Sequence, residues 1–236
     1  MGSCYNVESD RKINELSFSK SEFSKPTFSK SICTIVFQDK TSYGFLIKLF
    51  KGQEDFFCLM TSEYFGGINL GKILFYFGED KQSREILLDS NERIIEDLRD
   101  FDIDETVIEI LPKDNIPMDY FLLPNMDHAN NINELIYKEI VIFQFQYQSW
   151  KLYSSFGKII SIKDNEFSYA SITPLSSSGY PIFLKDSSKV IGISKKSPQK
   201  DNYGNFIMPI FNYFRNYNDK NKALNESKEL IKFNTK

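Results

Sequence analysis

Residues 176–184 read SSSGYPIFL, and residues 189–193 read KVIGI. A turn of small residues leads into a strand that begins at Pro181, and a polar turn at residues 185–188 returns the chain along an apolar strand with a central glycine. Two short apolar runs joined by a polar turn predict a β-hairpin. This hairpin displays Ser178 at its mouth.

The hairpin resembles the nucleophile segment of the chymotrypsin-like (trypsin-like) serine proteases, whose pattern is Gly-x-Ser-Gly-x-Pro before a strand, a turn and a second strand. The resemblance places Ser178 at the nucleophile, with Gly179 and Pro181 where the family has them. Two departures change the surroundings of the nucleophile. The oxyanion-hole region becomes Ser176–Ser177, with Ser176 in place of a glycine, and Tyr180 replaces a small residue.

Two more landmarks of that family occur in the family's chain order. Residues 43–47 read YGFLI and residues 60–64 read MTSEY, where the family has a GTGFxI strand followed by LTAAH. Tyr64 therefore occupies the position of the catalytic histidine. Residues 104–110, DETVIEI, resemble the strand that presents the triad aspartate, which makes Asp104 its equivalent. The order Tyr64, Asp104, Ser178 matches base, acid and nucleophile.

The tyrosine at the base position decides the expected chemistry. A serine hydroxyl needs a neighbouring base of near-neutral pKa, whereas the pKa of tyrosine is about 10. Glu63 is adjacent, but neighbouring side chains on an extended segment point in different directions. The chain's single histidine, His128, lies in the polar loop PNMDHANN, at residues 124–131. We therefore expect an inactive protease homologue, with Glu63 or His128 as the unorthodox base of an alternative, active serine endopeptidase.

The strand pattern extends the resemblance over residues 31–217. Short β-rich runs separated by turns predict an all-β protein, and the resemblance implies a trypsin-like double antiparallel β-barrel with a short C-terminal helix. We expect a flexible arm over residues 1–30, barrels at about 31–120 and 135–205, and a helix near 206–216. Residues 218–236 form a tail with apolar spacing suited to a second helix.

The amino-acid composition limits the classes of binding partner and the cellular compartment that we expect. The net charge of −3 over 236 residues gives no global attraction to nucleic acid. Three scattered cysteines and one histidine predict neither a disulfide framework nor a metal site, and no cofactor motif occurs. We therefore expect a cytoplasmic protein. Gly2 and Cys4 resemble a dual-acylation signal, which would associate the chain with a membrane surface, although Asn6 stands where that signal prefers Ser or Thr.

The expected partner is an extended peptide or protein segment in the cleft between the barrels. It would pair with the strand that follows Val190, near Ile193, Ser194 and Lys195, with Tyr64 and Tyr180 as aromatic contacts. A second alternative is a membrane-tethered scaffold protein in which the acylated arm carries the function and the cleft is vestigial.

Overall fold

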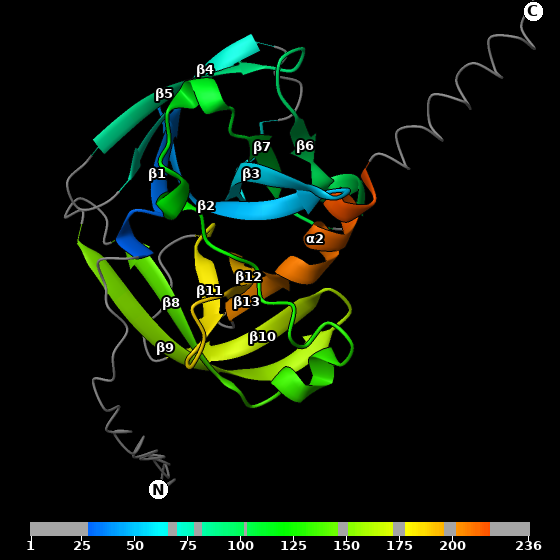
Figure 1. The fold of residues 1–236 in the computed structure, drawn as a ribbon. Helices are drawn as coiled ribbons and strands as arrows, with labels where there is room; N and C mark the ends of the chain where they lie inside the picture. Colours follow the sequence, from blue (N-terminus) through cyan, green and yellow to red (C-terminus); the bar gives the residue numbers. More distant parts are fainter. Residues whose placement is uncertain are drawn as a thin grey trace, which may run out of the picture.

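A computed structural model describes residues 28–65, 70–77, 82–101, 103–145, 151–171, 178–195 and 202–217. The first half of the chain forms a seven-stranded antiparallel sheet in the order β5-β4-β1-β2-β3-β7-β6 (Figure 1). Its strands are β1 (Ile32–Phe37), β2 (Lys40–Lys51), β3 (Glu54–Thr61), β4 (Leu70–Phe77), β5 (Gln82–Asp89), β6 (Ile95–Asp97) and β7 (Thr106–Glu109).

The second half forms a closed six-stranded barrel in the order β10-β13-β12-β11-β8-β9. Its strands are β8 (Glu139–Phe145), β9 (Leu152–Lys163), β10 (Glu166–Ser171), β11 (Pro181–Leu184), β12 (Val190–Lys195) and β13 (Asn202–Phe206), and the helix α2 (Ile207–Arg215) follows directly. The expected all-β, trypsin-like fold with a short C-terminal helix is confirmed. The first unit differs from a barrel because its end strands, β5 and β6, do not pair with one another in the part of the chain that the structure describes.

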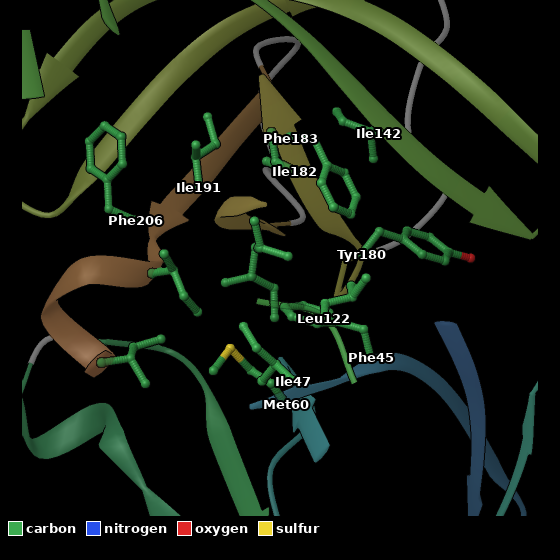
Figure 2. Close-up of a cluster of buried hydrophobic side chains, with 14 of the residues drawn as sticks. Phe45, Ile47, Met60, Leu122, Ile142, Tyr180, Ile182, Phe183, Ile191 and Phe206 are labelled. Atoms are coloured by element: carbon green, nitrogen blue, oxygen red, sulfur yellow. The ribbon is translucent and has the colours of Figure 1, made fainter. Parts of the chain in front are cut away.

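The hydrophobic core runs continuously from the sheet into the barrel. Phe45 and Met60 of the sheet belong to the same buried cluster as Leu122, Ile182 and Ile191 (Figure 2). Buried apolar side chains recur along the strands because alternate residues face the same side. Burial of this cluster holds the two halves together, since apolar area removed from water is the main favourable contribution to folding.

The linker between the halves contributes backbone hydrogen bonds to both of them. The amide of Lys48 donates to the carbonyl of Leu122 at 2.9 Å, and the amide of Leu122 donates to Leu46 at 3.0 Å. Three residues further on, the amide of Asn125 donates to the carbonyl of Val190 at 2.7 Å. The linker therefore fixes strand β12 of the barrel relative to strand β2 of the sheet.

Helix α2 packs on the sheet through one apolar face. Ile207, Ile210, Phe211 and Phe214 are buried, at the spacing of one helical face. The ring of Phe214 stacks on Phe56 of β3 with the centroids 4.8 Å apart. The helix thus ties the end of the barrel domain back to the first half of the chain.

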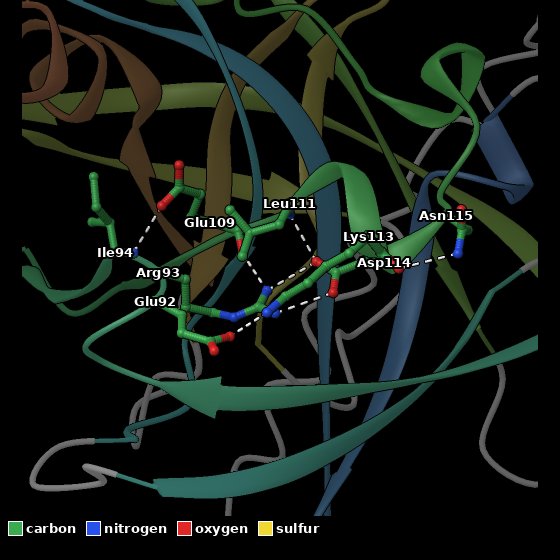
Figure 3. Close-up of polar contacts among 8 residues, drawn as sticks. All are labelled: Glu92, Arg93, Ile94, Glu109, Leu111, Lys113, Asp114 and Asn115. Carbon is green, nitrogen blue, oxygen red and sulfur yellow. Dashed lines mark hydrogen bonds and ion pairs between the residues drawn. The ribbon is translucent and has the colours of Figure 1, made fainter.

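A buried ion pair stabilises the first half (Figure 3). Arg93 and Asp114 form a bidentate pair at 2.9 and 3.1 Å, and their side chains are only 1% and 6% exposed. Arg93 also donates to the backbone carbonyl of Glu109 at 2.8 Å. This pair joins the connection between β5 and β6 to the short 3-10 helix at Pro112–Asp114.

The expected flexible arm meets the fold earlier than its predicted end. Phe28 is buried, and its ring lies 5.1 Å from that of Phe143 and 4.9 Å from that of Phe183. Phe28 therefore packs in the core with side chains of the barrel. The rest of the arm, with Gly2 and Cys4, and the tail at 218–236 lie outside the described residues. Among the residues described, no helix has the length and apolar character needed to cross a membrane.

Candidate active site

Ser178 lies three residues before the first residue of strand β11 and contacts Ser62, which follows the end of strand β3. Its Oγ accepts a hydrogen bond from the Oγ of Ser62 at 2.7 Å. The two serines are 116 positions apart in the chain, so the contact joins the barrel to the sheet. Ser178 thus faces a second hydroxyl, which cannot act as a base at neutral pH.

Gly179 lies where the backbone passes close to Tyr43 of strand β2, and this close approach fixes the position of Ser178. Its φ is +94°, and a Cβ at this position would lie 2.2 Å from the carbonyl oxygen of Tyr43. Its amide donates to the carbonyl of Ser194 at 2.9 Å, and the amide of Ser194 donates to Tyr180 at 2.8 Å. Only glycine fits such a position without strain, so the backbone on both sides of Gly179 is fixed.

Tyr64, at the expected base position, is engaged away from Ser178. Its side chain is 52% exposed, and the guanidinium carbon of Arg99 lies 3.2 Å from the centre of its ring. Arg99 is held in turn by both carboxylate oxygens of Asp97. No hydrogen bond among the described residues joins Tyr64 to Ser178. The tyrosine therefore forms a cation–π stack on the surface of the sheet.

Asp104, at the expected acid position, forms an ion pair with Lys195. The two charged groups are 2.6 Å apart, and Lys195 also pairs with Glu166 of β10. Partial burial acts to lower the pKa of Lys195, but its hydrogen bonds to Asp104 and Glu166 outweigh this and raise the pKa. Lys195 therefore stays protonated and cannot serve as a base for Ser178, while the charge of Asp104 is already compensated.

A buried carboxyl that the sequence analysis did not single out lies beside this ion pair. Glu105 is 0% exposed, and both its oxygens accept hydrogen bonds from the Nδ2 of Asn205, at 2.8 Å. Burial raises the pKa of Glu105 to about 8, against the lowering effect of Asn205, so the carboxyl is mainly protonated at pH 7. Strand alternation was the available signal, since Glu105 shares a face with the buried Val107.

The residues that we expected to contact a peptide differ in how far their side chains are exposed to solvent. Tyr180, Ile193 and Ser194 are each 0% exposed, so Tyr180 is part of the core and not an aromatic contact for a peptide. Its ring packs on Tyr43, and its hydroxyl donates to the carbonyl of Phe145. The backbone of Ser194 already pairs with residues 179 and 180. The Lys195 side chain is 18% exposed, so among these expected contacts only Lys195 and Tyr64 are open to solvent.

Neither of the unorthodox bases meets the serine. The backbone amide of Glu63 donates to the Oγ1 of Thr61, and no hydrogen bond in the described chain joins Glu63 to Ser178. His128 lies beside Glu134, at 3.6 Å, near the turn that joins β11 to β12. That turn precedes Val190, which is four residues from Ser194, or about 13 Å along an extended strand. His128 is therefore at the opposite end of the hairpin from Ser178.

Two comparisons of the sequence with known proteins found nothing: neither a protein-family model nor a curated protein matches it. Solved structures do resemble it. The catalytically active tobacco etch virus protease complexed with product is 15% identical and superposes with a TM-score of 0.53, over 84% of this chain and 81% of the protease. Deg5 is 13% identical, with a TM-score of 0.55, over 81% of this chain and 91% of Deg5. The shared feature is the chymotrypsin-like fold.

Within that fold, no hydrogen bond among the described residues joins Tyr64, Asp104 and Ser178, which we expected at the triad positions. Ser178 pairs with Ser62, Tyr64 with Arg99, and Asp104 with Lys195. Ser176 and Ser177, the expected oxyanion-hole region, lie outside the described residues. Among the described residues, no group of three or more His, Cys, Asp or Glu side chains could hold a metal ion.

Proposed function

We propose that this chain is a catalytically inactive protease homologue that binds an extended peptide or protein segment beside Ser178. The observation that carries the proposal is the hydrogen bond from Ser62 to Ser178, with no base in contact with that serine in the described chain. An accepted hydrogen bond withdraws electron density from the serine oxygen. Attack on a carbonyl carbon needs the opposite, which is a partner that removes the proton.

The end of strand β12 supports the binding part of the proposal. Up to Ser194, β12 has strand β13 on one side and the chain around β11 on the other. After Ser194 the chain on the β11 side turns away through Gly179 toward Ser178, while Lys195 still pairs with Tyr203 of β13. We infer that an extended peptide pairs with β12 at Lys195, by addition of a strand. The structurally similar tobacco etch virus protease is complexed with product, which supports peptide binding as the proposed role.

Absence of an activated serine is tested with a fluorophosphonate probe. We expect the wild-type protein to label no faster than its Ser178→Ala variant, because an unactivated serine hydroxyl reacts with such probes only at background rate. We expect Tyr64→His to remain silent as well, because Asp104 is bound to Lys195 and is not available to orient an imidazole. In-gel fluorescence, followed over several hours, measures the labelling of the wild-type protein and of the two variants. Labelling of the wild type that disappears in Ser178→Ala would establish an active serine hydrolase instead.

Strand addition is tested with a peptide selected against the immobilised protein from a random library. Methylating every second backbone nitrogen of that peptide should weaken binding at least tenfold in one register and leave it nearly unchanged in the other. The reason is that one edge of a paired strand uses alternate amides. Fluorescence polarisation measures the affinities. Equal tolerance of both methylation registers, or failure to select any peptide, would contradict the proposal.

A further inference from the structure

A polar groove of about 480 Å³ lies at the end of the barrel that carries the turn between β11 and β12. Its walls come from the loop after Pro124, from the beginning of β8 and from that turn. A groove of this size is in the range that holds small ligands. It is separated from Ser178 by the length of the hairpin, so it is independent of the proposed peptide site.

The floor of the groove is held rigidly by Asn125, which is only 8% exposed. Its amide Nδ2 donates to the Oγ of Ser187 at 3.2 Å, and its Oδ1 accepts from the backbone amide of Asp127 at 3.0 Å. Its own backbone amide is bound by Val190. The groove is thus formed before any ligand arrives, which avoids an ordering cost on binding.

One wall is an exposed aromatic residue in a strained backbone conformation. Tyr137 has a φ of +68°, in the left-handed region that bulky side chains rarely adopt. Its backbone amide donates to the carbonyl of Ile159 at 2.9 Å, and its side chain is 69% exposed. The ring gains little packing to offset this strain. Strained residues of this kind persist mainly at ligand sites.

The charges of the groove select against an ionic ligand. Lys185 is paired with Glu139 at 2.8 Å, and Lys189 with Asp127 at 3.5 Å. Asp186 and Lys138 also line the groove, whereas Lys189 lies beside its lining and reaches it through Asp127. These charges nearly cancel, and no cluster of side chains in the described residues could hold a metal ion. The groove therefore offers many hydrogen-bonding groups without a net field.

We propose that this groove binds a saccharide, with one face of a pyranose ring stacked on Tyr137. A sugar ring has an apolar face of C–H groups and a rim of hydroxyls, which both donate and accept hydrogen bonds. The aromatic ring of Tyr137 matches the face, and Asp186, Lys138 and His128 supply acceptors and donors for the rim.

The test uses the full chain and a panel of methyl pyranosides of glucose, galactose, mannose and N-acetylglucosamine. At least one of them should shift the amide resonances of Tyr137 and Lys138 in a saturable NMR titration. Tyr137→Asn should weaken that binding at least tenfold and should leave Tm unchanged or raise it, since asparagine tolerates the left-handed conformation. Tyr137→Phe keeps the ring and should retain most of the affinity.

The matched control is Tyr153→Asn, which removes another exposed tyrosine, on strand β9, outside the groove. It should leave the titration unchanged. The proposal is overturned if none of the four glycosides shifts these resonances, or if binding survives Tyr137→Asn. A fall in Tm in Tyr137→Asn would also overturn it, because the ring would then serve packing. Reactivity toward the fluorophosphonate probe has no bearing on these outcomes.

Discussion

Arg93→Met should lower the free energy of unfolding by roughly 3–5 kcal/mol, the typical cost of removing one partner from a buried ion pair. The substitution leaves the carboxylate of Asp114, which is 6% exposed, without its cation. It also removes the hydrogen bond from Arg93 to the carbonyl of Glu109. The methionine side chain fills much of the same volume, so lost electrostatic pairing accounts for most of the effect.

Urea denaturation followed by circular dichroism measures this cost. The matched control is Lys72→Met, which breaks an ion pair with Glu85 whose side chains are 64% and 58% exposed. Exposed pairs contribute about 0–1 kcal/mol, so the control should be nearly neutral. The double variant Arg93→Met, Asp114→Leu removes both charges and should recover much of the loss. Equal costs for Arg93→Met and Lys72→Met would show that the buried pair is not important for stability.

The hairpin around Ser178 could be predicted from sequence because its signals are local. A proline begins β11 at Pro181, a polar turn follows Leu184, and an apolar run forms β12 from Val190. The helix expected at 206–216 has a similar basis, since residues 207, 210, 211 and 214 repeat at helical spacing and are buried. Both features depend on residues that are close together in the chain. Local sequence patterns can therefore predict them.

The pairing within the candidate site could not be predicted in the same way. Lys195 meets Asp104 and Glu166 from positions that are far apart in the sequence, and charged residues in a sequence usually indicate solvent-exposed faces. The partner of Ser178 was missed for the same reason. Ser62 lies two residues before Tyr64, and only the folded chain brings its hydroxyl to Ser178.

Tyr180 shows where a resemblance misled and a simpler signal was available. Its position beside the nucleophile suggested a contact for a bound peptide. In the structure, however, Tyr180 is completely buried, and so are Ile182 and Phe183, which follow it on opposite faces of the strand. A large aromatic residue at this position fills the core between the halves, packed on Tyr43. The continuous apolar run that follows it, Pro181–Leu184, was therefore the better guide to this side chain than position within a motif.

Gly179→Ala should destabilise the protein by about 4 kcal/mol or more, in the range found only for severe steric or burial defects. The new Cβ would lie 2.2 Å from the carbonyl oxygen of Tyr43 and 2.9 Å from its carbon, and both are backbone atoms of strand β2. A flexible side chain could move aside, but a paired strand cannot do so without losing hydrogen bonds. The left-handed φ of +94° adds a separate cost of about 1–2 kcal/mol.

Gly52→Ala separates these two costs, because Gly52 has a φ of +65° in the turn between β2 and β3. We expect it to lose only the conformational part, about 1–2 kcal/mol, in the same thermal or urea unfolding experiment. The additional loss of stability in Gly179→Ala, relative to Gly52→Ala, then measures the steric cost of the close approach between the barrel and the sheet. If the two variants lose equal stability, the crossing at Tyr43 is looser than the structure shows. A larger loss at Gly179 means that the position of Ser178 against Ser62 depends on a glycine, whether or not the serine takes part in chemistry.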